Sequence, residues 1–89
     1  MDKRKIIVAD IEDNCDTPLA ELVHIACQFK SRIMLKTGSK EFNAKSIMGL
    51  MVMNLERGMA VEIEAEGGDE AEAALAVEKF LEGRYGKQE

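Results

Sequence analysis

Apolar and polar residues alternate most regularly between residues 59 and 66, and this pattern predicts a β-strand. The apolar positions of the alternation are Met59, Val61, Ile63 and Ala65. Because successive side chains of a strand point to opposite faces, the apolar side should face the interior and the intervening glutamates should face water. β-Branched and apolar stretches predict further strands at 5–11, 32–36 and 40–43. The last two should pair as a hairpin around Gly38.

Two longer segments follow the helical period. The first helix should begin at Thr17, an N-cap residue, with Pro18 in its first turn. Its buried stripe should consist of Leu19, Leu22, Val23, Ala26 and Phe29. We expect His24 to lie in solvent and Cys27, beside the stripe, to be half-buried.

The last helix should begin at Asp69, because Glu72 three residues later completes a capping-box pattern. Gly83 should end it. Its buried residues should be Ala73, Val77, Phe80 and Leu81.

With a short helix between the hairpin and the strand at 59–66, the predicted order is β-α-β-β-α-β-α. Because the strands carry apolar residues mainly on one side, we expect an α+β fold with a four-stranded sheet and three helices on one face. The chain of 89 residues is too short for two independent cores, so we expect one domain, 1–89.

Composition narrows the classes of function. A formal net charge of −5 argues against general nucleic-acid binding, which needs a basic face. Two cysteines and one histidine provide neither a disulfide scaffold nor a cluster of metal ligands. The apolar run near the N-terminus is far shorter than the ~20 residues of a membrane span. We therefore expect a soluble cytoplasmic protein with no metal, no cofactor and no membrane contact.

The segment 43–51 reads Asn-Ala-Lys-Ser-Ile-Met-Gly-Leu-Met and places a hydroxyl, Ser46, at the start of a short apolar helix that should end at 52 or 53. It closely resembles the regulatory-serine segment of the histidine-containing phosphocarrier (HPr) proteins of the bacterial sugar phosphotransferase system. The resemblance runs from Lys3 to Leu81 without a gap. It implies an open-faced β-sandwich of four antiparallel strands and three helices.

Two interpretations of Ser46 remain open. A serine at this position satisfies a free helix amide as an N-cap, which is worth about 1 kcal/mol. The resemblance implies a second role, because Gram-positive HPr proteins and their regulatory paralogues are phosphorylated at this serine by an ATP-dependent kinase and then bind a catabolite-repression transcription factor. A phosphate would meet the free helix amides, with Lys45 beside it. Ile47, Met48 and Met51 would form a partner-binding patch around it, unless the methionines fill the core.

The loop 13–18 reads Asp-Asn-Cys-Asp-Thr-Pro where HPr proteins carry Gly-Ile-His-Ala-Arg-Pro just before their first helix. The resemblance therefore places Cys15 at the phosphorylated histidine and Thr17 at the phosphate-binding arginine. Acidic neighbours disfavour a thiolate at Cys15 and repel a phosphoryl group. The N-terminus of the adjacent helix has the opposite effect, because it stabilises negative charge on the thiolate and on the phosphoryl group. Cys15 is an inert residue of a retired site, a redox-sensitive thiol or a phosphocysteine nucleophile. His24, nine residues further along, is too distant for a direct dyad.

The sequence thus predicts a regulatory protein-binding module of the phosphotransferase system rather than an enzyme. Ser46 is its predicted phosphorylation site, and the predicted partner-binding residues are Thr17, Ile47, Met48 and Met51. Its partners should be proteins: a serine kinase, phosphotransferase-system proteins or a transcription regulator, with no small-molecule substrate. The alternative is a divergent phosphocarrier that transfers a phosphoryl group through Cys15. A third possibility is a domain that retains the fold as a scaffold.

Overall fold

The computed structural model describes residues 1–9 and 18–83, while 10–17 and 84–89 lie outside the described part. The elements are, in order, β1 (Asp2–Ile7), α1 (Pro18–Cys27), β2 (Arg32–Thr37), β3 (Lys40–Asn43), α2 (Ile47–Met53), β4 (Ala60–Glu66) and α3 (Glu70–Leu81). This is the predicted order. The predictions for the loop around Cys15 and for Thr17 as an N-cap fall outside the described residues.

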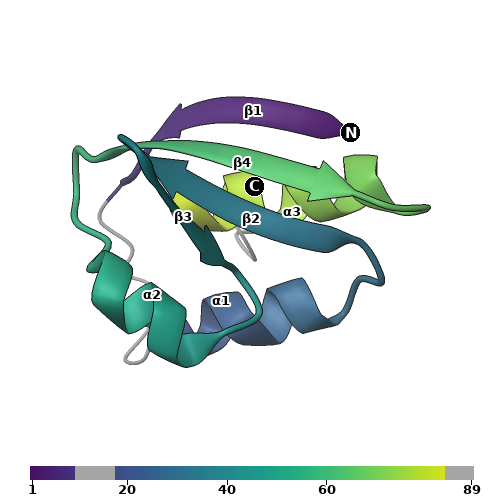
Figure 1. The fold of residues 1–89 in the computed structure, drawn as a ribbon, viewed down its shortest axis with the longest axis horizontal. Helices are drawn as coiled ribbons and strands as arrows, with labels where there is room; N and C mark the ends of the chain where they lie inside the picture. Colours follow the sequence, from purple (N-terminus) through teal and green to yellow (C-terminus); the bar gives the residue numbers. More distant parts are fainter. Residues whose placement is uncertain (10–17, 84–89) are drawn as a thin grey trace.

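The four strands form one antiparallel sheet in the spatial order β1-β4-β2-β3. All three helices lie on one face of this sheet and leave the other face open (Figure 1). β4 occupies the centre, between β1 and β2, and its apolar side chains at Val61, Ile63 and Ala65 are buried against the helix layer. The predicted α+β open-faced sandwich is therefore confirmed.

The core lies between the sheet and the helices. Its largest fully buried side chains are Leu22, Ile25, Ile33, Leu35, Leu50, Ile63 and Leu81. Every predicted buried residue of the last helix is buried, and Ala74 joins them. In α1 the predicted stripe is confirmed by Leu22 and Ala26, with Leu19, Val23 and Phe29 partly buried against the core. Ile25, which was not predicted, completes the buried side of α1.

The first strand was predicted too late in the chain. β1 covers Asp2–Ile7 instead of 5–11, and it pairs with β4 along its whole length. Lys3 and Lys5 occupy alternate positions that are exposed to solvent, so this part of the strand lacks the apolar pattern that identifies a strand in a sequence. Cross-strand pairing with β4, rather than local propensity, fixes these residues in the sheet.

The capping box predicted for α3 is wrong, although Asp69 is indeed the N-cap residue. The Asp69 carboxylate makes no cap hydrogen bond within its own helix. It instead accepts hydrogen bonds from the backbone amides of Lys30 and Ser31, each at 2.9 Å, and from the Ser31 hydroxyl. The carboxylate thus directs its hydrogen bonds to the α1–β2 connection and not to a backbone amide of α3. The carboxylate of Glu70 accepts a hydrogen bond from the backbone amide of Gly67 at 3.1 Å.

One glutamate of β4 departs from the prediction that this side of the strand faces water. Glu64 is only 9% exposed, although it lies on the open face of the sheet. The ammonium group of Lys36 lies 2.7 Å from its carboxylate and that of Lys3 lies 3.8 Å away, from the strands on either side. The bond from Lys36 holds the pKa of Glu64 below its usual value. The long lysine side chains thus cover a charge that the pattern alone places in water.

Candidate functional site

Ser46 lies at the start of α2, as predicted. Its backbone is extended, with φ −113° and ψ 112°, and its hydroxyl oxygen accepts a hydrogen bond from the amide of Gly49 at 3.2 Å. Its carbonyl accepts the amide of Leu50 at 3.1 Å, which begins the helical ladder. A Cβ atom at position 49 would lie 3.5 Å from the Ser46 hydroxyl, so the glycine leaves that oxygen uncovered on this side. The N-cap role of Ser46 is confirmed.

The segment before Ser46 is fixed to both layers of the fold. The amide of Ala44 bonds to the carbonyl of Ile33 in β2 at 3.0 Å, and Ala44 is buried. The amide of Lys45 bonds to the Asn43 side chain at 2.8 Å. The Lys45 ammonium donates a hydrogen bond to the carbonyl of Phe29, two residues after α1, at 2.8 Å. These contacts give Ser46 a defined position, and they commit the Lys45 side chain to α1 rather than to the serine beside it.

An exposed apolar surface follows Ser46 along α2, and we call it the α2 patch. Its members are Ile47 (40% exposed), Met48 (75%), Met51 (63%) and Val52 (74%). Leu50 and Met53 point the other way and are buried, so they anchor the helix to the core. The alternative that the methionines fill the core is therefore wrong for Met48 and Met51.

Val52 was not predicted as part of this surface. It lies four residues after Met48, and residues three and four apart share one face of a helix. That spacing was the available signal. The helix 47–53 contains no charged residue, so the α2 patch is apolar without interruption. An exposed group of large apolar side chains beside a hydroxyl is typical of a protein-binding surface rather than of a catalytic cleft.

Four other residues carry sequence predictions. Cys15 and Thr17 lie outside the described residues, so their predicted roles stay predictions. His24 is exposed on α1, as expected. Cys27 is exposed and not half-buried, which corrects the prediction. Because Ile25 is buried together with Leu22 and Ala26, the buried side of α1 is centred between Ile25 and Ala26. Cys27 lies beyond the edge of that side.

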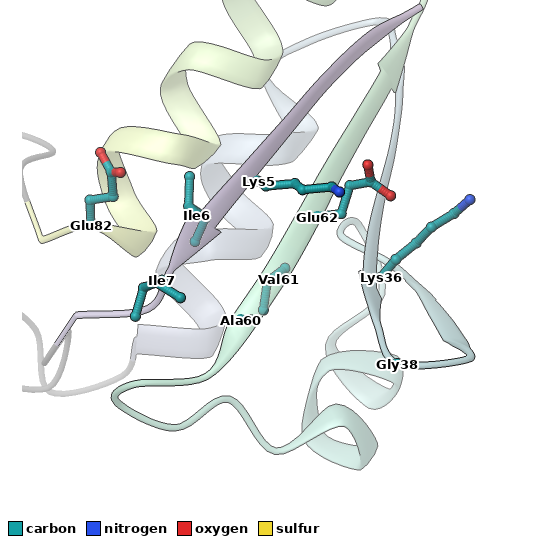
Figure 2. A pocket seen from close by; sticks show the side chains of 9 residues that line it. All are labelled: Lys5, Ile6, Ile7, Lys36, Gly38, Ala60, Val61, Glu62 and Glu82. Carbon is teal, nitrogen blue, oxygen red and sulfur yellow. The ribbon is translucent and has the colours of Figure 1, made fainter.

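Residues of the open face help to line a groove of about 590 Å³ at the end of β1 and the start of β4. Ile7 and Ala60 are a cross-strand pair on its surface, while the side chains of Lys5 and Glu62 point toward one another and that of Lys36 extends away (Figure 2). The lining of the groove also includes Ile6, Val61 and Glu82, the last of which directly follows α3 (Figure 2). Its lining contains no cysteine, serine, threonine or histidine.

The described part of the chain contains no group of three or more histidine, cysteine, aspartate or glutamate residues that could hold a metal ion. No helix within residues 1–9 and 18–83 is long and apolar enough to cross a membrane.

Comparison with known proteins gives one consistent result. The family described as "PTS HPr component phosphorylation site" matches residues 3–83. The "Phosphocarrier protein HPr" of Neisseria meningitidis is 41% identical over 64 residues, which is 72% of each chain. The "HPr-like protein Crh" of Halalkalibacterium halodurans is 42% identical over 65 residues, covering 73% of this chain and 77% of that protein. Among solved structures, HPr-C-His from Thermoanaerobacter tengcongensis matches with a TM-score of 0.86 and 34% identity over all of both chains.

The fold, the serine at the start of α2 and these matches agree with one another. Members of the matched family are phosphocarrier proteins, which act with other proteins of the sugar phosphotransferase system and are not enzymes in their own right. The chain belongs to the HPr family of that system.

Proposed function

We propose that this protein is a regulatory member of the HPr family, which binds protein partners according to the phosphorylation of Ser46 and has lost the phosphohistidine carrier site. The α2 patch is the observation that carries the proposal. Met48, Met51 and Val52 are each more than 60% exposed and lie within two turns of the Ser46 hydroxyl. Leaving such side chains in water is unfavourable, and a partner that covers them recovers that free energy.

Because α2 carries no charged residue, a phosphate at Ser46 would change the character of this surface strongly. Residues 47–53 carry no charge, and the nearest cation, Lys45, is bonded to Phe29. A phosphate at Ser46 would bring about −1.5 to −2 charges to the edge of an otherwise apolar patch. A partner with an arginine or lysine beside an apolar surface would bind the modified form through both features. The unmodified form would offer the apolar feature alone.

Loss of the carrier site is proposed from the sequence around Cys15. The chain has one histidine, His24, and it is exposed on α1. Cys15 and Thr17 replace the histidine and arginine that the family uses to receive and hold the phosphoryl group. Among the relatives, the Crh protein is called HPr-like rather than a phosphocarrier, which supports a regulatory role for a member of this family. Phosphorylation by an ATP-dependent kinase would take place in the cytoplasm, where ATP is available, and we take 1–89 to act as one domain.

The test is phosphopeptide mapping after incubation with extract of the source cells, with ATP in one sample and phosphoenolpyruvate in the other. We expect label on Ser46 with ATP only. The variant Ser46→Asn should lose the label yet keep the helix cap, because asparagine is as good an N-cap as serine. The variant Cys15→Ala should keep the label.

Two other outcomes would replace the proposal. Thiol-linked label on Cys15 with phosphoenolpyruvate, absent from Cys15→Ala, would make the protein a cysteine phosphocarrier. Absence of label in both samples would favour a scaffold. Ser46→Ala alone would be a poor control, since it removes the hydroxyl and the cap together and costs about 1 kcal/mol of stability.

A further inference from the structure

The methionines of this chain differ widely in access to solvent. Met48 is 75% and Met51 63% exposed, whereas Met53, on the inner side of the same helix, is 6% exposed. Met34 and Met59 are partly buried. Met1 is 60% exposed but lies at the start of β1, on the far side of the sheet from α2 (Figure 1). Apart from Met1, the exposed methionines of the chain thus both lie on α2.

Met48 and Met51 also share a face. They are three residues apart on α2, a spacing that brings side chains together on a helix surface. Both lie in the α2 patch, and together they supply two of its four members. A chemical change at these two sulfur atoms would alter half of the patch and leave the buried anchors Leu50 and Met53 in place.

We propose that Met48 and Met51 form a modification site for peroxide, at which oxidation to methionine sulfoxide switches off the α2 patch as a docking surface. A lone pair on the thioether sulfur attacks one peroxide oxygen, the O–O bond breaks and a sulfur–oxygen bond forms. The sulfur is oxidised by two electrons, and hydrogen peroxide is reduced to water. The product side chain is polar and chiral, and it disrupts methionine-rich contact surfaces.

Oxidation should not unfold α2. The N-cap bond from Gly49 to Ser46 involves no sulfur atom, and Leu50 is completely buried. The effect therefore falls on the surface and not on the fold. This inference rests on the proposed docking role of the α2 patch, to which it adds a second control that is independent of phosphate. The two inputs would meet on one helix, at Ser46 and at the sulfur atoms that follow it.

The modification is tested by peptide mapping of the folded protein during a hydrogen peroxide time course. Because susceptibility follows exposure, we expect Met48 and Met51 to gain one oxygen each about tenfold faster than Met53. A thiol reductant added before digestion restores reversibly oxidised cysteines such as exposed Cys27 but leaves methionine sulfoxide, so it separates the two chemistries. Methionine sulfoxide reductases should then remove the added oxygen. Equal rates at Met48 and Met53 would overturn the proposal.

The consequence for the surface is tested by retention on a hydrophobic column, which needs no partner. Oxidised protein should elute earlier than untreated protein. The double variant Met48→Leu with Met51→Leu keeps an apolar patch without sulfur, so peroxide should shift its retention much less than that of the wild-type protein, and the remaining shift should come from Met1. A shift as large as that of the wild-type protein would assign the effect to another site and reject the proposal.

These readouts remain informative if Ser46 proves not to be phosphorylated. In that event the proposed function fails, while the oxidation rates and column retention still decide whether the methionine site exists. Where Ser46 is labelled with ATP, the rate of labelling before and after peroxide gives the functional measure. We expect that rate to fall in the wild-type protein and to be unchanged in the double leucine variant. An unchanged rate in oxidised wild-type protein would show that the switch does not reach the docking step.

Discussion

The carboxylate of Asp69 accepts a hydrogen bond from the backbone amide of Ser31 at 2.9 Å and another from the Ser31 hydroxyl. These residues are 38 positions apart in the sequence. Ser31 is 1% exposed, so the bond is shielded from water on the serine side. The bond joins the connection between α1 and β2 to the start of α3. It therefore ties the end of α1 to the beginning of α3.

The backbone at Gly67 allows this contact, and a glycine is required there. Its φ is +151°, and a Cβ atom would lie 2.8 Å from the Cα atom of Ser31. Gly67→Ala should therefore destabilise the fold by about 2 kcal/mol through backbone strain and overlap. Gly68→Ala is the matched control, since a Cβ atom there meets nothing within 4 Å. Chemical denaturation of both variants gives the comparison, and equal stabilities would contradict the proposed steric requirement.

Acid should weaken the same contact. Bonds from Ser31 and from the amide of Lys30 lower the pKa of Asp69 below its usual 3.8. A lowered pKa in the folded state means that the bond contributes fully above the ordinary value and is lost as pH falls through the folded value. Wild-type protein should thus be more stable than Asp69→Asn at pH 7, and the difference should shrink below about pH 4. Urea unfolding of both proteins between pH 2 and 7 measures it, and a constant difference would argue against this role for the carboxylate.

The lysine that covers Glu64 should control its titration. Removal of the ammonium group in Lys36→Ala leaves Lys3, at 3.8 Å, as the one cation paired with Glu64 in the described part of the chain. The pKa of Glu64 should then rise, because the hydrogen bond from Lys36 is the largest cause of its lowering. Carbon-detected NMR titration of the side chain reports the change directly. Lys40→Ala, an exposed lysine of β3, should leave the titration as it is.

A charge placed in the α2 patch should impair recognition without unfolding the protein. Val52 is 74% exposed, so Val52→Asp should change stability by no more than about 0.5 kcal/mol. It should slow ATP-dependent labelling of Ser46 by about tenfold, because an enzyme that covers the patch would have to bury an unpaired carboxylate. Leu75→Asp on α3 is the control for an added surface charge, since Leu75 is an exposed apolar residue outside the patch. Equal labelling rates for both variants would show that the kinase does not contact Val52.

Features that depend on local pattern were predictable from the sequence. The hairpin of β2 and β3, the alternation of β4 and the cap at Ser46 each follow from residues close together in the chain. The capping-box pattern assigns Asp69 a partner within its own helix. Its observed partner, Ser31, is distant in sequence and is not marked by any motif. Lys3 and Lys5 concealed the start of β1 because a strand with one solvated face can be polar at alternate positions.

The candidate site was predictable in part for a similar reason. Ser46 and Met48 follow from an N-cap followed by an apolar run. Which apolar residues of so short a helix face solvent depends on how the helix rests on the core, and this excluded Val52 from the prediction. Cys27 illustrates the same limit, since it lies ~140° around the helix from Leu22 at 100° per residue, beyond the buried side that includes Ile25. Packing between elements, and not the sequence of one element, sets such boundaries.

The central position of β4 in the sheet has a consequence for folding during synthesis on the ribosome. β1 pairs with β4 alone, and β2 pairs with β4 on its other side, so both join the sheet through a strand that ends at Glu66. During synthesis the first three strands emerge before the segment that unites them. The nascent chain can form the β2–β3 hairpin early, but β1 has no strand to pair with until the residues of β4, up to Glu66, have been made. Lysines on that waiting strand would help to keep it from pairing with other nascent chains.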